Sequence, residues 1–285
     1  MKIVKFLGGL GNQLFQYAFY LALEQKFEKV KADLLDFEEY TLHNGFELEA
    51  IFNIKLTEIS AFEQNLYTRN NRKWLWRKLR RVLNTRSCYF EEKIPFSYSA
   101  ELFNDHKSRY YWGYWQHIDY ITPVASLLRQ KLIFPTIEDI ENKLIQKLIH
   151  QSNAVSLHVR RGDYLKEPLF KDICTEDYYQ QSIRYILETQ ESPLFVIFSN
   201  DIEWCKTVFK DLHAVFVDHN TGINSFRDLQ LMSMCNHHII ANSSFSWWGA
   251  WLNERPDKIV VCPKKWINDA AIDTTGLVLP NFITF

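Results

Sequence analysis

The residues of this chain that are best suited to chemistry lie in the segment HVRRGDY at 158–164. Arg160 and Arg161 place two guanidinium groups side by side, and each presents a planar fork of donors that matches phosphate oxygens. The mostly apolar run at 154–159 predicts a buried parallel strand just before them. Ligands of open α/β sheets sit at the carboxyl ends of the strands. The position therefore predicts an anion site, although RRGD alone would also fit a surface turn with a local salt bridge.

Two other predicted strands also end in polar groups. Asp201 follows the predicted strand at 194–198, and Ser243 and Ser244 stand where a helix at 244–253 is expected to begin. A helix N-terminus offers free backbone N–H groups and the positive end of the helix dipole. Because parallel strands end at the same edge of a sheet, we expect these groups to converge with the arginines. Such a set predicts a diphosphate site that needs no metal, and the chain has no D-x-D metal pattern.

A glycine-rich turn at 8–11 separates a predicted strand at 3–7 from a predicted helix, for which Asn12 is the expected N-cap. Gly9 and Gly11 allow close approach of the backbone to a ligand. A dinucleotide fingerprint would need a third glycine where this chain has Leu14. With Asp33 near the position of a ribose-binding acid, a dinucleotide-dependent oxidoreductase remains an alternative, as does a plain tight turn.

Strands and helices alternate along the chain, most clearly from 154 to 262, which predicts an α/β protein with parallel sheets. The loop-like segment near 135 and the helical pattern at 140–150 predict two domains, at 1–150 and 151–285.

Composition restricts the class of protein. The 285 residues carry a net charge of −1, so no whole-chain charge argument favours nucleic acid. The five cysteines are scattered and form no C-x-x-C pair, which indicates reduced thiols rather than a disulfide framework or zinc site. No signal peptide is recognisable, and no apolar run reaches the roughly 18 residues of a membrane span. These features predict a cytoplasmic protein.

Two segments allow more than one interpretation. The stretch at 69–86 is rich in Arg and Lys, and no acid occurs between Glu63 and Glu91. It predicts a basic amphipathic helix that either lies on an anionic membrane or presents a solvated face. The aromatic segment YYWGYWQH at 110–117 either lines a sugar site or packs a core. The nine Trp and fourteen Tyr of the chain also leave a non-catalytic sugar-binding protein open.

Five motifs, taken in order, resemble the α-1,2-fucosyltransferases of glycosyltransferase family 11. They are GGLGNQLFQYAFYLA (8–22), FELEAIFNI (46–54), YWGYWQ (111–116), HVRRGDY (158–164) and LMSMCNHHIIANSSFSWWGAWL (231–252). The resemblance runs across nearly the whole chain. It implies a GT-B-like fold of two Rossmann-like domains facing across a cleft. It also implies inverting transfer of L-fucose from GDP-β-L-fucose to a galactose 2-hydroxyl, without a metal or other cofactor.

The resemblance also implies roles for individual residues. Arg160 matches the arginine on the donor β-phosphate, which stabilises the departing GDP, and His158 matches a residue beside guanine. Asp228 matches a guanine-binding aspartate by its spacing from Ser244. The remaining matches are Ser243, Ser244 and Phe245 around the ribose and phosphates, and Gly9, Gly11 and Asn12 in an amino-terminal loop facing the donor.

The proton acceptor is not singled out. The amino-terminal half holds four candidates that could take the proton of the acceptor hydroxyl: Asp33, Asp36, His43 and Glu47. If the transition state is loose, no strong base is needed, and Asn12 or a water would be enough. Asp163 is expected to order the arginine loop. The acceptor is expected to be a galactose-terminated oligosaccharide or a lipid-linked glycan. The enzyme would then work in the cytoplasm, with peripheral contact to the inner membrane face through 69–86.

Overall fold

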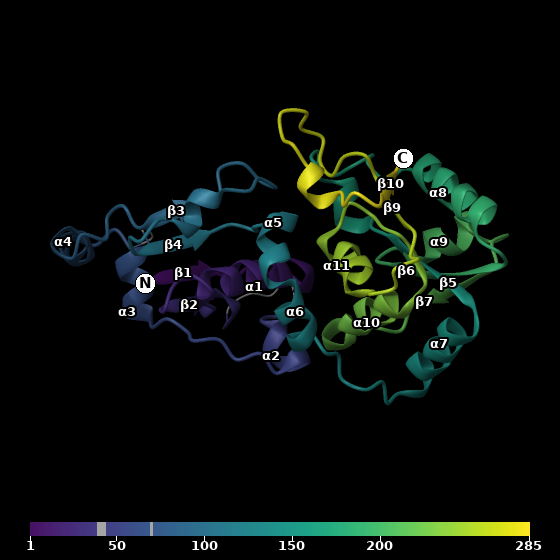
Figure 1. Cartoon of the computed structure of the whole chain (residues 1–285), viewed down its shortest axis with the longest axis horizontal. Coiled ribbons are helices and arrows are strands. Elements are labelled where there is room, and N and C mark those ends of the chain that lie inside the picture. The colour runs from purple at the N-terminus through teal and green to yellow at the C-terminus, as the bar shows by residue number, and fades with distance from the viewer. Residues whose placement is uncertain (39–43, 69–70) are drawn as a thin grey trace. The chain divides into compact units, whose positions relative to one another are not determined.

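The computed structural model describes residues 1–38, 44–68 and 71–285. The chain forms two compact units, Met1–Ile133 and Phe134–Phe285 (Figure 1). The units divide earlier than the boundary predicted at residue 150. The helix α7 (Ile140–Gln151) belongs to the second unit, because Ile145 and Ile149 on its inner face pack in a core cluster with residues of that unit's sheet.

The first unit is built on a parallel sheet of four strands in the order β2-β1-β4-β3. The strands are β1 (Lys2–Lys5), β2 (Val30–Asp33), β3 (Tyr89–Glu91) and β4 (Arg109–Trp112). Its helices are α1 (Leu10–Glu24), α2 (Glu47–Phe52), α3 (Ala61–Tyr67), α4 (Trp74–Val82), α5 (Ile118–Ile121) and α6 (Ala125–Lys131). The sequence did not predict β3, a short strand at the edge of the sheet.

Aromatic packing around α1 forms the core of the first unit. Phe19 stacks on Trp115 with ring centroids 4.3 Å apart, and the rings of Tyr111 and Tyr120 meet it edge-on. All four side chains are buried. Most of the aromatic segment at 110–117 therefore packs the core, whereas Tyr114 is 38% exposed.

The second unit is built on a parallel sheet of six strands in the order β10-β9-β8-β5-β6-β7. The strands are β5 (Asn153–Val159), β6 (Pro193–Ser199), β7 (Ala214–Val217), β8 (His237–Ile239), β9 (Val260–Cys262) and β10 (Phe282–Thr284). The helices after α7 are α8 (Glu176–Thr189), α9 (Ile202–Val208), α10 (Phe226–Met234) and α11 (Ser244–Leu252). The sequence predicted β5, β6 and α11 within a few residues, and it did not predict β10.

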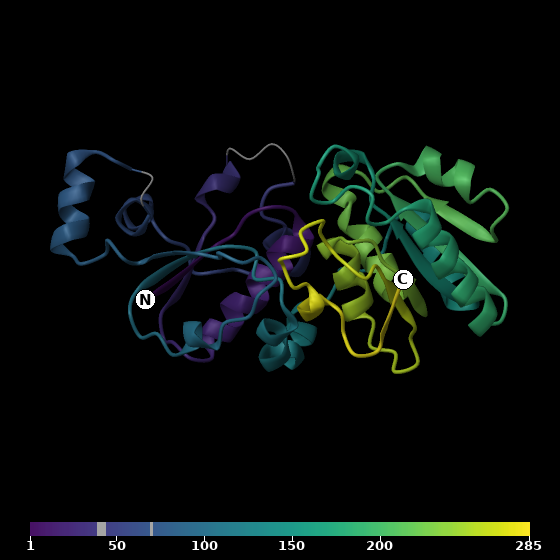
Figure 2. The same ribbon diagram turned by 90° about the horizontal axis from the view of Figure 1, so that it is seen from above.

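Both faces of this sheet are covered, as a parallel sheet requires. Val155, Leu157 and Val159 of β5 pack against α8 and α9. Val196 and Phe198 of the neighbouring β6 pack in a second cluster with α7 and α10. Figure 2 shows helices on both sides of the strands of this unit. The strands are therefore apolar on both sides, and the polar groups gather at their carboxyl ends. Within the described ranges, no helix is long and apolar enough to cross a membrane.

Candidate active site

The arginine loop follows β5 directly. Arg160 donates from Nη2 to Oδ2 of Asp163 at 2.7 Å, and its guanidinium lies 5.2 Å from the ring centroid of Tyr164. The Nε atom of Arg160 is buried and has no hydrogen-bond partner among the residues that the structure describes. A buried, unpaired donor on a cation is costly. Arg160 is thus held in place at one nitrogen, and a second donor, Nε, has no partner among the described residues.

Arg161 makes different contacts. Its Nε donates to Oδ2 of Asp201 at 3.1 Å, and its guanidinium lies 4.1 Å from the ring centroid of Trp204. Its backbone N–H donates to Oδ1 of Asn200 at 2.9 Å, and Asn200 also donates to Asp163. The loop after β5 is therefore tied to the loop after β6, as expected for adjacent parallel strands.

Gly162 is the position in this loop that only glycine fits. Its φ is +26°, and a Cβ there would collide with the Asn200 side chain. The glycine therefore permits the close contact between the two loops.

His158 lies at the end of β5, beside Phe245 of α11, with ring centroids 6.1 Å apart. It is 7% exposed. Burial, and secondarily the charge of Arg160, lowers the pKa of His158 to about 3, so the imidazole is neutral at physiological pH. Its Nδ1 is also buried without a hydrogen-bond partner among the described residues. A neutral ring with an open nitrogen suits a polar aromatic ligand such as a nucleobase.

The turn after β8 forms the N-terminus of α11. Ser243 is the N-cap, and its Oγ accepts from the backbone N–H of Phe245 at 3.3 Å. Ser244 is the first residue of the helix, as the sequence predicted. Because β8 pairs with β5, this helix start lies at the same sheet edge as the arginine loop.

Asp228 lies in the first turn of α10. Asn220 donates to its Oδ1 at 2.8 Å, and Asn220 in turn is bonded to Asn142 of α7. Burial raises the pKa of Asp228 to about 7. Asn142 and Asn220 could not be recognised from the sequence, because neither belongs to a motif and they are far apart in the chain.

A second network, buried beneath α11, joins three elements. His238 of β8 is bonded through Nδ1 to Ser156 of β5 and through Nε2 to Asn253, which follows α11, each at 2.7 Å. Burial lowers the pKa of His238, so the ring stays neutral. This histidine therefore has a structural role, because both ring nitrogens are used to join β5, β8 and the residue after α11.

The glycine turn of the first unit differs from the prediction in one respect. The N-cap of α1 is Gly9 and the helix begins at Leu10, so Asn12 is not its N-cap. The chain turns earlier because Gly8 adopts a φ of +78°, a left-handed conformation that favours glycine. The side chain of Asn12 instead accepts a hydrogen bond from Nε2 of Gln116 at 2.7 Å. Gly11 is buried within the helix.

Glu92 supports the turn that carries Gln116. Its Oε2 accepts from the backbone N–H groups of Tyr114 and Trp115, at 2.7 and 3.3 Å. Trp115 has a φ of +57°, which strains a non-glycine residue and needs such support. Burial raises the pKa of Glu92. The role of Glu92 could not be recognised from the sequence, since its partners become close only when β3 pairs with β4.

The structure distinguishes among the candidate bases. Asp33 is fully buried and accepts from Tyr110 at 2.5 Å, so it can reach neither an acceptor nor a cofactor ribose. Asp36 pairs with Lys5 at 2.8 Å. Glu47 is buried and bonded to Asn44, and burial raises its pKa. His43 lies outside the described residues.

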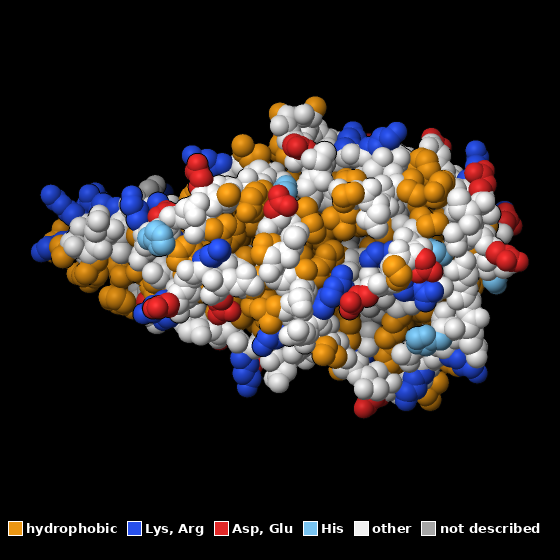
Figure 3. All heavy atoms as spheres, in the orientation of Figure 1, with side chains coloured by type: hydrophobic (Ala, Val, Ile, Leu, Met, Phe, Trp, Pro, Cys, Tyr) orange, Lys and Arg blue, Asp and Glu red, His pale blue; other side chains and the backbone are white. Residues whose placement is uncertain are grey.

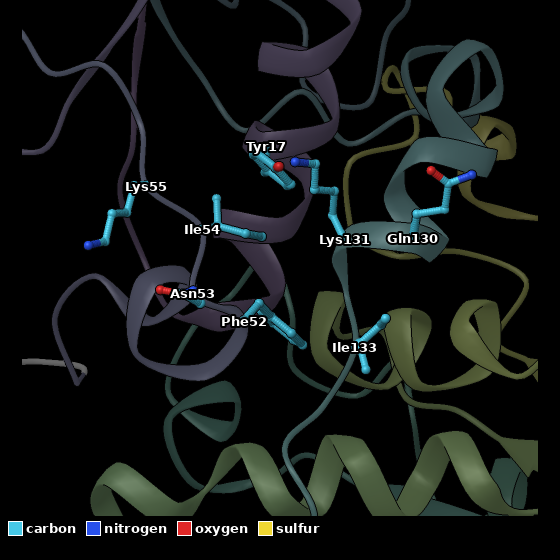
Figure 4. Close-up of a pocket in the computed structure, with 8 residues that line it drawn as sticks. All are labelled: Tyr17, Phe52, Asn53, Ile54, Lys55, Gln130, Lys131 and Ile133. Carbon is cyan, nitrogen blue, oxygen red and sulfur yellow. The ribbon is translucent and has the colours of Figure 1, made fainter.

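A pocket on the first unit lies among residues that the sequence analysis did not select. It is lined by Tyr17, Phe52, Asn53, Ile54, Lys55, Gln130, Lys131 and Ile133. Figure 4 shows the Lys131 ammonium pointing toward Tyr17, whereas Lys55 points away. The lining mixes cationic and amide groups with apolar side chains and offers no acid–base pair. Elsewhere in the described ranges, no group of three or more His, Cys, Asp or Glu residues is arranged to hold a metal.

Comparison with solved structures defines the class of fold. The chain resembles NodZ, an α-1,6-fucosyltransferase whose crystal was soaked with GDP-fucose, with a TM-score of 0.50 and 13% identity. The match covers 88% of this chain and 92% of that one. The fold is thus GT-B-like, with two Rossmann-like units.

The sequence then identifies the family. Residues 1–283 match glycosyl transferase family 11, and the chain belongs to that family. It is 35% identical to the alpha-1,2-colitosyltransferase of Escherichia coli, over 93% of this chain and 91% of the relative. It is 33% identical to the O-antigen biosynthesis glycosyltransferase WbnK of Escherichia coli, over 91% and 92%. The protein is therefore a glycosyltransferase, which displaces the oxidoreductase and non-catalytic alternatives.

Proposed function

We propose that this enzyme transfers L-fucose from GDP-β-L-fucose to the 2-hydroxyl of a galactose, with inversion and without a metal. The observation that carries the proposal is Arg160, which follows the carboxyl end of β5 and whose buried Nε has no partner among the described residues. His158 and the start of α11 lie at the same sheet edge. These groups supply a cation, a helix N-terminus and a ring contact, which a guanosine diphosphate requires.

The proposed reaction follows from these groups. The acceptor oxygen bonds to C1 of fucose as the bond from C1 to the β-phosphate oxygen breaks, and GDP leaves with the electron pair. Arg160 and the N–H groups at the start of α11 stabilise the negative charge that develops on the diphosphate. Asp228 accepts from the N1–H and N2–H groups of guanine, and His158 and Phe245 flank the base. Asn12, held by Gln116, orients the acceptor hydroxyl, whose proton passes to solvent.

The decisive experiment is the substitution Arg160→Ala, assayed by release of GDP and by transfer to a galactoside. We expect kcat to fall by about two to three orders of magnitude, as when one donor to a developing charge is removed. The circular dichroism spectrum should stay unchanged, because Arg160 forms no part of the core. Near-normal transfer by a folded variant would refute the role of Arg160. Activity that EDTA abolishes and Mg²⁺ or Mn²⁺ restores would refute metal independence.

A second donor has a specific observation in its favour. The relative with 35% identity over most of the chain is named a colitosyltransferase. Colitose is fucose without its 3-hydroxyl, so the same diphosphate and guanine contacts serve both donors. We favour fucose because several other relatives are named galactoside fucosyltransferases, one of which is 35% identical over 35% of this chain. Competition between GDP-fucose and GDP-colitose under identical conditions will decide, since the preferred donor has the higher kcat/KM.

We also propose which acceptor the enzyme uses and where in the cell it acts. One relative over nearly the whole chain takes part in O-antigen biosynthesis. We infer that the acceptor is a galactose-terminated, lipid-linked glycan and that the enzyme acts on the cytoplasmic side of the inner membrane. A screen of glycan acceptors with linkage analysis of the product tests the acceptor. Failure of every galactoside, with transfer to another sugar, would contradict it.

A further inference from the structure

The helix α4 presents apolar side chains to solvent. Trp74, Leu75 and Val82 are 71%, 54% and 72% exposed, and Leu83 directly after the helix is 50% exposed. Leu75 and Val82 are seven residues apart, which places them on one stripe of the helix. Within a 9-residue helix this is a continuous apolar strip that no other described residue covers. Single exposed apolar side chains are normal, but a contiguous strip marks an interaction surface.

The opposite side of α4 is fixed to the first unit. Arg80 is buried and donates to the backbone carbonyls of Asn65, Thr68 and Asn71, at 2.8, 2.9 and 2.6 Å. The ring of Trp76 packs on Phe62 of α3, with centroids 5.2 Å apart. Arg80 is therefore a structural residue, and the contacts hold the helix so that its apolar strip faces outward.

Basic side chains border the strip. Arg77, Lys78 and Arg81 are exposed, and none of them forms an ion pair with a described carboxylate. The Lys78 ammonium lies 5.2 Å from the Trp74 ring centroid, so cation and aromatic ring occur together. Figure 3 shows Lys and Arg side chains gathered beside hydrophobic ones at the end of the first unit that carries α4 in Figure 1. The surface therefore combines apolar side chains with positive charges that no described carboxylate neutralises.

We propose that this α4 surface, Trp74–Leu83, docks the enzyme on an anionic lipid bilayer. Trp is suited to the depth of the headgroups, aliphatic side chains enter the acyl boundary, and Arg and Lys meet lipid phosphates. Charge complementarity favours a bilayer over a second copy of the chain. A symmetric dimer through this strip would bring the same cations of two protomers together. The segment predicted from sequence extends to Arg69, which lies outside the described residues.

The proposal predicts sedimentation of the full-length enzyme with vesicles of phosphatidylglycerol and phosphatidylcholine, and little with phosphatidylcholine alone. Each cation near an anionic surface strengthens binding about fivefold, so Arg77→Gln with Lys78→Gln and Arg81→Gln should weaken it about 100-fold. Added salt should also weaken the binding of the wild-type enzyme to anionic vesicles, because salt screens the attraction between the charges. Leu75→Ser with Val82→Ser should weaken it at least about tenfold, because the apolar area no longer leaves water.

A matched control exists on α7, where Leu144 is 57% exposed and is flanked by exposed Lys143 and Lys147. Lys143→Gln with Lys147→Gln and Leu144→Ser should leave vesicle binding unchanged. All variants should transfer fucose normally to a soluble acceptor, and the α4 variants alone should be slow on an acceptor embedded in vesicles. Equal binding to neutral vesicles, undiminished binding by both α4 variants, or a dimer that only those variants dissociate would overturn the proposal.

Discussion

Arg160 and Arg161 are neighbours in the chain, but their guanidinium groups have different hydrogen-bond and ion-pair partners. Arg161 is stacked on Trp204 and paired with Asp201, so its charge is already partly neutralised. Arg160 is paired with Asp163, which is more than half exposed, and keeps Nε open. A phosphate would therefore gain more from Arg160, while Arg161 fixes the loop that presents it.

Asp228 should make GDP binding depend on pH. Its folded-state pKa is raised by burial to about 7, and only the ionised carboxylate accepts from two N–H groups of guanine. Below about pH 7 the affinity for GDP should therefore fall, by up to about tenfold per pH unit. Calorimetric titration of GDP between pH 6 and 8 measures this, and Asp228→Asn should bind weakly at every pH. An affinity that rises toward low pH would contradict the role.

Ionisation of the buried Asp228 carboxyl should lower the free energy of unfolding. Its pKa in the folded protein lies above the unfolded value of 3.8, so the cost is absent below that value and grows as the pH rises toward 7. Above about pH 7 it is complete. Asp228→Asn keeps an oxygen for Asn220 and should raise the melting temperature at pH 8 more than at pH 5. Scanning calorimetry at the two pH values tests this, and a variant less stable at pH 8 would show that the carboxylate is stabilised by its neighbours.

At the scale of elements, Glu92 joins β3 to the turn after β4. We expect Glu92→Ala to raise the acceptor KM and to lower stability by about 1 kcal/mol or more, because two backbone N–H groups lose their acceptor. Glu92→Gln keeps that acceptor and should restore both properties. Initial rates with varied acceptor and thermal unfolding provide the measurements. A Gln variant that keeps its KM and loses kcat would indicate that Glu92 takes the proton instead.

The sequence predicts elements well where periodicity is strong and local. The strands β5 and β6 and the helices α7 and α11 are predicted within about two residues, since buried parallel strands and amphipathic helices have distinct patterns. The short edge strands β3 and β10 were missed, because three residues give no period. Asn12 was misplaced as a helix cap because the positive φ of Gly8 is a property of the folded turn. The convergence of Asp201 with the arginine loop was predicted from the order of the strands, but its pairing with Arg161 in particular was not, because side-chain directions in loops leave no pattern in the sequence.

At the scale of the whole molecule, each compact unit has its own sheet and its own core. The proposed contacts to GDP come from β5, α10 and α11 and their adjoining loops, all within Phe134–Phe285. The proposed acceptor-side group, Asn12, lies in Met1–Ile133. Under the proposed roles, binding of GDP should therefore depend on residues of the second unit, and Asn12 should affect the transfer step.

The second unit alone can be tested for GDP binding. A fragment spanning Phe134–Phe285 should fold, because its clusters on both sheet faces consist of its own residues, and should bind GDP without any transfer. In the full chain, Asn12→Ala should keep the GDP affinity and lose most of kcat, whereas Arg160→Ala should lose both. Calorimetry with GDP and a transfer assay on the same preparations separate these effects. A folded fragment that cannot bind GDP, together with weakened GDP binding in Asn12→Ala, would mean that the first unit completes the donor site.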